Sequence, residues 1–213
     1  LSGKILVDQR SRLILSGGNR RDIEQLGASL TNTNDVLGRS LASSSLITVG
    51  SNTSLTNINL SIFALEIEPL KNFEVRFGGS YRTLRSASDQ FSLDYYTNED
   101  QTEIASEIDQ TEISTMLTYS PGRKTTGYGV ERTVINDGDF PRLFFNYAVG
   151  IKDVFSSDFE YEKVQFYYRH PWQLGGVGKL TTTLEAGKTF GEVPLGLLNV
   201  VPGNQTLFSI YGT

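Results

Sequence analysis

Cysteine is absent from the 213 residues, and histidine, methionine and tryptophan each occur once. Without cysteine the chain has no disulfide framework, thiolate metal site or cysteine nucleophile, and the lone His170 cannot build a multi-histidine metal centre. No stretch approaches about 18 consecutive apolar residues, which excludes a transmembrane helix. A net charge of −5 with scattered cations argues against nucleic acid as a partner.

What is abundant points to strands. The chain holds 12 Phe, 10 Tyr and 21 Gly, a composition typical of β-rich proteins. It begins at Leu1 without a charged leader region, and it ends at Thr213 within the strand-like run TLFSIYGT. We therefore expect residues 1–213 to be part of one domain whose strands continue beyond the C-terminal end.

The clearest pattern is the period-2 alternation of Phe73–Thr83, FEVRFGGSYRT. Eleven residues in strand conformation reach about 36 Å, long for a strand of a soluble sheet. About eight further strands are predicted. Their ranges are Ser2–Val7, Arg12–Gly17, Asn57–Ile67, Glu112–Tyr119, Arg142–Ile151, Lys163–His170, Lys179–Lys188 and Gln205–Tyr211.

Short and long connections alternate along the chain, apart from the long stretch Pro121–Pro141. Short turns on one rim and long polar loops on the other are typical of an outer-membrane barrel. The predicted fold class is therefore all-β, a partial antiparallel transmembrane β-barrel of about nine strands with long polar loops. A soluble β-sandwich or a lipocalin-like barrel produces the same alternation and stays open as an alternative. The aromatic residues expected at the membrane interfaces are Phe73, Tyr81, Tyr119 and Trp172.

The polar faces of the predicted strands carry the candidate lumen-facing residues. In a barrel such charges pair across neighbouring strands, or they line a selective pore. The candidates are Glu74, Arg76, Arg82, Lys163, Arg169, Lys179 and Glu185.

Two acidic stretches have the carboxylates that a cation site needs. Asn98–Glu112 holds six carboxylates, and we interpret it as a solvated loop rather than a divalent-cation site. Asp137 and Asp139 are weak metal candidates within Asn136–Asp139, where a plain Asx/Gly turn is favoured. No metal and no cofactor is predicted.

Three further segments allow two interpretations each. His170 is expected to be an interfacial residue beside Trp172 rather than a general base, because no serine lies near it in sequence. The apolar stretch Phe190–Gly203 is either a surface loop or a segment that folds into the lumen as a plug, packs on a partner or contacts the outer leaflet. RRDIEQLGASL, residues 20–30, is either a short amphipathic helix or part of a loop.

Several stretches resemble an uncharacterised Bacteroidota family in which a carboxypeptidase-regulatory-like domain precedes an outer-membrane β-barrel. They are YSPGRK at Tyr119–Lys124, DFPRLFFNYAVGIK at Asp139–Lys152, SDFEYEKVQ at Ser157–Gln165, LEAGKTFGEVP at Leu184–Pro194 and PGNQT at Pro202–Thr206. The resemblance implies a cell outer membrane location and a barrel to which this chain contributes part of the wall. It implies no mechanism.

We therefore predict a non-enzymatic outer-membrane protein that serves in envelope transport, in biogenesis or as a scaffold. The expected partners are the lipid bilayer and lipopolysaccharide, together with other outer-membrane or periplasmic proteins. A barrel of the outer-membrane insertion or translocation type is one alternative, and a soluble binding module is another.

Overall fold

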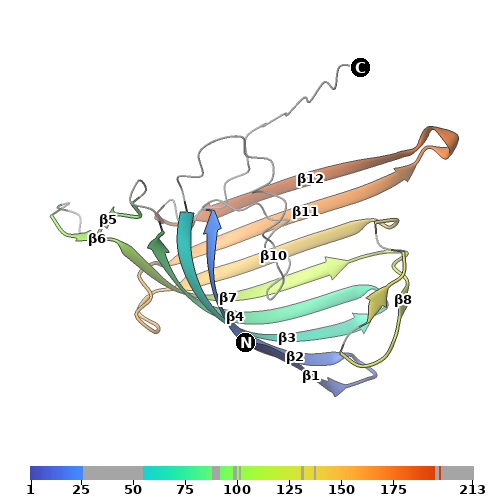
Figure 1. Ribbon diagram of the computed structural model, residues 1–213, viewed down its shortest axis with the longest axis horizontal. Helices are drawn as coiled ribbons and strands as arrows, with labels where there is room; N and C mark the ends of the chain where they lie inside the picture. Colours follow the sequence, from blue (N-terminus) through green and yellow to red (C-terminus); the bar gives the residue numbers. More distant parts are fainter. Residues whose placement is uncertain are drawn as a thin grey trace.

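One large antiparallel sheet dominates the computed structural model, which describes residues 1–25, 55–87, 92–97, 100, 102–130, 132–136, 138–194 and 197 (Figure 1). Its eight strands follow the order of the chain, with each strand beside the next. They are β1 (Ser2–Asp8), β2 (Leu13–Gln25), β3 (Leu55–Leu70), β4 (Phe73–Ser86), β7 (Glu107–Tyr119), β10 (Arg142–Ile151), β11 (Tyr161–Gln173) and β12 (Lys179–Phe190). Within this described part of the chain the sheet is open, with β1 at one edge and β12 at the other.

Three small elements decorate the sheet. β5 (Tyr95–Tyr96) pairs with β6 (Ile104–Ala105), and β8 (Thr125–Thr126) pairs with β9 (Thr133–Val134). A 3-10 turn, Gly175–Val177, lies between β11 and β12. Among the described residues, no helix is long and apolar enough to cross a membrane.

Eight of the predicted strands are confirmed, and the ninth, Gln205–Tyr211, lies outside the described residues. Several strands run further than the sequence pattern indicated. β3 has 16 residues and β4 has 14, against a mean of about 5 to 6 in soluble proteins.

Two sequence-based expectations are corrected by these longer strands. Residues 20–25 belong to β2, so a helix there is wrong, and cross-strand pairing to β3 outweighs the weak helical pattern. The acidic stretch before Tyr119 is not all loop either. Glu107, Asp109 and Glu112 lie within β7, each paired in register with β4.

The connections divide the sheet into two ends. At one end, which we name the turn end, lie the turns that join β1 to β2, β3 to β4 and β11 to β12, together with residues 120–141. At the other end, the loop end, lie the longer connections after β2, β4 and β10, and the residues after β12. The predicted separation of short turns from long loops is therefore present, with residues 120–141 as the exception that the sequence already indicated.

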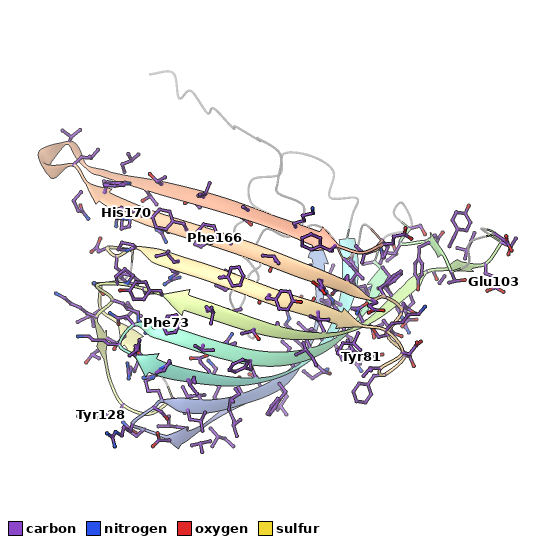
Figure 2. All side chains as sticks on the ribbon, turned by 180° about the vertical axis from the view of Figure 1, so that it is seen from behind. Phe73, Tyr81, Glu103, Tyr128, Phe166 and His170 are labelled. Atoms are coloured by element: carbon purple, nitrogen blue, oxygen red, sulfur yellow. The ribbon has the colours of Figure 1, made fainter. Side chains whose placement is uncertain are left out.

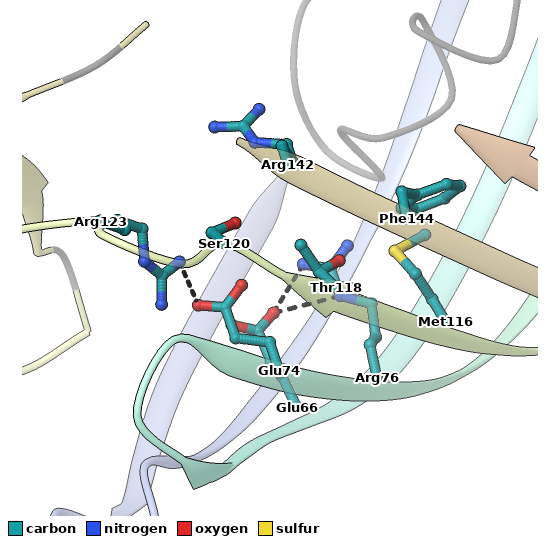
Figure 3. Close-up of a pocket in the computed structure, with 9 residues that line it drawn as sticks. All are labelled: Glu66, Glu74, Arg76, Met116, Thr118, Ser120, Arg123, Arg142 and Phe144. Carbon is teal, nitrogen blue, oxygen red and sulfur yellow. Dashed lines mark hydrogen bonds and ion pairs between the residues drawn. The ribbon is translucent and has the colours of Figure 1, made fainter. Parts of the chain in front are cut away.

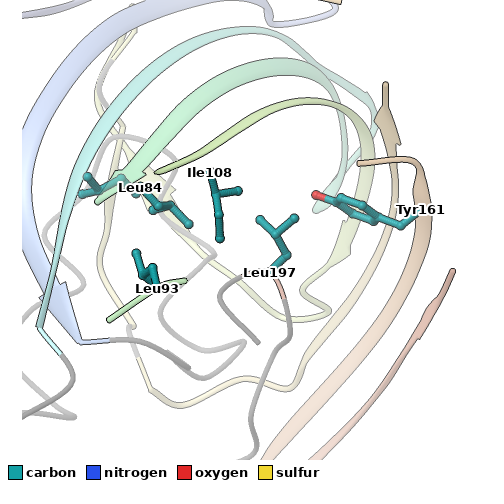
Figure 4. Close-up of a cluster of buried hydrophobic side chains, with 6 residues drawn as sticks. Leu84, Leu93, Ile108, Tyr161 and Leu197 are labelled. Carbon is teal, nitrogen blue, oxygen red and sulfur yellow. The ribbon is translucent and has the colours of Figure 1, made fainter. Parts of the chain in front are cut away.

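The sheet curves strongly, so it has a concave and a convex face (Figures 1 and 4). A cluster of buried apolar side chains lies inside the curve near the loop end (Figure 4). It consists of Ile58, Leu84, Leu93, Ile108, Tyr161 and Leu197. Leu93 and Leu197 come from connections, so chain segments after β4 and β12 fold towards the concave face.

Gly150 shows how closely the concave face is packed at this point. A Cβ at position 150 would overlap the ring of Tyr161, and it would lie 2.8 Å from the Gln110 amide nitrogen. Because only glycine leaves room here, the Tyr161 ring can lie over β10 and reach the polar groups of β7.

Candidate functional site

Apolar side chains cover the convex face although nothing in the described chain packs over them. Strand pleating places alternate residues on this face, and the large ones remain accessible. Phe63 is 60% exposed, Phe77 47% and Ile113 55%. The other exposed members are Ile5, Val7, Phe145, Tyr147, Leu180 and Leu184. We name this surface the apolar band; a contiguous exposed apolar surface of this kind marks a contact with a partner or a lipid phase.

Cross-strand register gives the apolar band two borders. Phe73, Tyr119 and Leu143 are register partners on β4, β7 and β10, and they form the turn-end border. Tyr81, Thr111 and Ile151 are register partners on the same strands, and they form the loop-end border. Figure 2 shows Phe73 and Tyr81 towards opposite ends of the sheet.

The borders are eight residues apart on each of the three strands, which is about 26 Å along a strand. At a strand tilt of about 40° this spacing would correspond to a height of about 20 Å, which compares with an apolar height of about 25 Å in transmembrane barrels. Beyond the loop-end border the convex face becomes polar, with Thr83, Asp109 and Asn59 in the next register row.

Aromatic side chains gather at both borders. At the turn end the rings of Phe73 and Tyr119 meet edge to face with centroids 6.5 Å apart. At the loop end Tyr81 meets Phe155 in the same way at 6.3 Å. Three of the four predicted interface aromatics therefore lie at a border of the apolar band.

Trp172, the fourth, continues the convex face of β11 towards the turn end and is 48% exposed. Its ring lies 4.1 Å from that of His170, and its indole nitrogen donates to Thr182 Oγ1 at 3.1 Å. His170 also contacts the Tyr168 hydroxyl through Nδ1 at 2.9 Å. The structure therefore places His170 beside Trp172, as expected, and a position at a membrane interface stays a prediction.

The concave face at the turn end carries a cluster of ion pairs (Figure 3). Glu68, only 8% exposed, accepts from Arg12 at 3.3 Å and from Arg123 and Arg132 at 3.2 Å each. Arg123 also binds Glu74 at 2.6 Å. We name these residues the turn-end ion cluster.

A second pair lies directly beside this cluster. Arg76 on β4 donates to Glu66 on β3 at 2.8 Å, and both residues line a cavity of about 200 Å³. Glu74, Arg123 and Arg142 line the same cavity (Figure 3). The concave face here is thus polar and charged, the reverse of the core that a curved sheet normally covers in a soluble protein.

A smaller group of charges, which we name the loop-end ion cluster, adjoins the buried apolar cluster of the concave face through Tyr161. Glu112 accepts from the Tyr161 hydroxyl at 2.6 Å and from Arg82 at 3.3 Å, and Lys163 lies 4.0 Å away. Arg82 also donates to the Tyr161 hydroxyl at 3.0 Å, and the Lys163 ammonium donates to the Leu197 carbonyl at 3.1 Å. These charges satisfy one another in a region that the apolar cluster shields from solvent.

The connection 120–141 is attached to both sides of the turn end. Arg123 and Arg132 hold it to β3 and β4 through Glu68 and Glu74. Asp139 holds it to Lys179 on β12 at 2.7 Å. This unusually long connection therefore runs across the turn end of the concave face in a fixed position.

Strand register places all seven predicted lumen-facing residues on the concave face, but it brings only some of them together. Glu74 and Arg76 belong to the turn-end region, while Arg82 and Lys163 share Glu112. Arg169, Lys179 and Glu185 lie on the same face of β11 and β12, nearer the open edge. Their role in a lumen stays a prediction.

Sequence reasoning missed the partners that complete these clusters. Glu66, Glu68, Arg12, Arg123, Arg132 and Tyr161 were not among the candidates. Glu66 could have been identified as a candidate once the strand register is known, because it lies on the concave face of β3 as the register partner of Arg76. Arg123 and Arg132 lie outside the large sheet and carry no such signal.

Only one of the two candidate metal ligands, Asp139, belongs to the part of the chain that the structure describes. Asp137 lies outside the described residues. Asp139 binds Lys179, and the backbone N–H of Asp139 donates to the Asn136 carbonyl at 3.1 Å, as in an ordinary turn. Over the described part of the chain, no group of three or more His, Asp or Glu side chains could hold a metal ion.

In its described part this is an all-β protein built on one antiparallel sheet, with an apolar convex face and a concave face that is charged at the turn end. The sequence model of the C-terminal domain of a family of unknown function, DUF5686, matches residues 64–209. The chain therefore belongs to the DUF5686 family. No curated protein and no solved structure matches it.

Proposed function

We propose that this chain forms part of the wall of a transmembrane β-barrel in a bacterial outer membrane, with no enzymatic activity. The apolar band carries the proposal. In water it would leave aromatic and aliphatic side chains exposed over several adjacent strands, whereas lipid would cover it. In the same arrangement the ion clusters face a lumen, where charged groups are tolerated.

The orientation follows from the two ends of the sheet. In outer-membrane barrels short turns face the periplasm and long loops face the exterior. The turn end would therefore be periplasmic and the loop end external. A Bacteroidota source and a preceding carboxypeptidase-regulatory-like domain remain expectations from the sequence resemblance.

Two features of the concave face favour a scaffold or assembly role over an open pore. Leu93 and Leu197 fold towards Ile108 and Tyr161 at the loop end. Residues 120–141 are held across the turn end by the turn-end ion cluster. Segments in both positions would narrow a lumen, so the Phe190–Gly203 stretch fits the plug interpretation in its described part.

Lipid contact of the apolar band is tested with one tryptophan placed in the middle of the band, Phe77→Trp in a Trp172→Phe background, because Trp172 is the only tryptophan in the chain. The full-length protein is reconstituted in vesicles with lipids brominated along the acyl chains. Bromine quenches an indole only in close contact, so quenching of Trp at 77 is expected. Emission that is insensitive to bromolipid, from a protein that stays monomeric without detergent, would contradict the barrel and support a soluble binding module.

Planar-bilayer conductance distinguishes a scaffold from a pore. A reconstituted barrel with a narrowed lumen is expected to show little steady conductance, and large stable channels would contradict the scaffold role. An insertion or translocation barrel, the second candidate, needs a seam that opens. An engineered disulfide between the first and last strands of the barrel would keep this seam closed. It would abolish insertion or translocation activity only if the protein is a barrel of this type.

A further inference from the structure

The connection between β10 and β11, residues 152–160, is hydrogen-bonded to the loop end of β7. Thr111 donates through its hydroxyl to the Val154 carbonyl at 2.7 Å, and its backbone N–H donates to Ser157 Oγ at 3.0 Å. Asp109 exchanges two hydrogen bonds with Asp158, at 2.8 and 2.9 Å. These bonds join the connection to the loop-end border of the apolar band.

The backbone of this connection is unusual. Asp153, Phe155 and Ser156 all have positive φ, at 63°, 52° and 64°. Left-handed conformations are costly for residues other than glycine, most of all for a bulky side chain such as phenylalanine. Such a turn persists because the surrounding hydrogen bonds determine its shape.

The result of this strained turn is an exposed apolar tip. Phe155 is 76% exposed and Val154 is 38% exposed. The Phe155 ring contacts Tyr81, which lies in the loop-end border row with Thr111 and Ile151. The tip is therefore continuous with the apolar band and lies at the level where the convex face becomes polar.

We propose that residues 153–156 form a preformed anchor that inserts Phe155 and Val154 into the interfacial layer of the lipid leaflet at the loop end. This inference rests on the proposed barrel and names a lipid contact that no regular strand residue provides. Aromatic side chains favour this layer because one part of the ring is apolar and the surroundings are half wet. Since the turn is already rigid, insertion costs little ordering entropy.

The test moves the single tryptophan. In a Trp172→Phe background, Phe155→Trp is compared with Tyr96→Trp in the full-length protein, reconstituted with lipids brominated at shallow or deep acyl positions. Tyr96 is a matched control, since it is 54% exposed at the same end but lies on the β5–β6 ribbon. Trp at 155 is expected to lose about half of its emission to shallow bromines and less to deep ones, while Trp at 96 is unaffected.

Each outcome separates the anchor from the barrel. If Phe77→Trp in the same Trp172→Phe background is quenched and Trp at 155 is not, the anchor is overturned and the barrel stands. If neither is quenched, the proposed function fails. Should Phe155→Trp not fold, Val154→Trp reports on the same tip, and an unquenched Val154→Trp likewise overturns the anchor.

Discussion

The two faces of the sheet come from the same strands but have opposite chemistry. Moving one residue along β4, from Phe77 to Gly78, passes from an exposed aromatic surface to a concave face lined by ion pairs. In a soluble curved sheet the concave face would hold the apolar core. Here the large apolar side chains of the convex face stay exposed in the described chain, while the concave face combines ion pairs at the turn end with a small apolar cluster at the loop end.

Removal of a concave carboxylate should have the largest effect on stability. Glu112→Leu leaves Arg82 and Lys163 without their shared anion in a shielded site, and we expect a loss of about 3–5 kcal/mol. Glu107→Leu is the matched control on the convex face of the same strand. It removes an exposed ion pair with Arg85, so the expected loss is below about 1 kcal/mol.

The measurement is urea unfolding of the full-length protein in vesicles or detergent. Similar losses for the two variants would contradict the contrast between the faces. In the Glu112→Leu variant Arg82 is a shielded cation without its carboxylate partner, so adding Arg82→Leu should recover stability. A further loss of stability in the double variant would also contradict the contrast between the faces.

A charge placed in the middle of the apolar band should be the next most costly change. Phe77→Lys lies midway between the two border rows, and we expect about 2–4 kcal/mol if lipid covers this surface. Thr83→Lys lies on the same face of β4 beyond the loop-end border, where a cation can face water and Asp109. If both lysines are tolerated equally in vesicles, the apolar band does not face lipid.

Two glycines compare the packing of the faces directly. Gly150→Ala on the concave face places a methyl group against Tyr161, and overpacking of this kind costs about 1–3 kcal/mol. Gly79→Ala on the convex face meets no atom within 4 Å, so its effect on unfolding is expected to be close to zero. Equal effects in thermal unfolding would indicate that Tyr161 can move away.

The smallest expected effect concerns Tyr95 on the β5–β6 ribbon. Burial raises the pKa of Tyr95 above its ordinary value, and the nearby Asp158 carboxylate raises it further. Because the folded protein favours the neutral phenol, this contribution to stability is present below the unfolded pKa of about 10 and is lost as pH rises beyond it.

Alkaline titration followed by tyrosinate absorbance measures this shift. Asp158→Asn is expected to lower the Tyr95 pKa only in part, since burial is the larger cause. A return to the ordinary tyrosine value would show that the carboxylate, and not burial, controls the group.

Much of the architecture could be predicted because strand pleating is a local property. Alternation in residues 73–83 correctly identified β4 and the two sets of residues that occupy opposite faces. For residues 20–30 the sequence allowed a short helix or a loop, and neither is present in residues 20–25, since pairing with β3 overrides a short helical pattern. The acidic stretch failed for a similar reason, as its carboxylates contribute to β7 through bonds to both neighbouring strands.

The ion clusters were only half predictable. Arg82 and Lys163 could be assigned to the polar face of their strands. Their shared partner Glu112 begins the predicted strand Glu112–Tyr119, but it was not among the lumen-facing candidates. The turn-end ion cluster depends on Arg123, which lies 55 residues from Glu68 in the chain. No periodic pattern connects positions so distant.

The sequence by itself determined the strands, their alternating faces and the sorting of short turns from long loops, because side-chain period and turn chemistry depend on neighbouring residues. Only the tertiary structure decided which face is concave, which charges meet and where the β10–β11 connection presents Phe155. Those features depend on cross-strand register and sheet curvature, which arise from contacts between residues far apart in the chain.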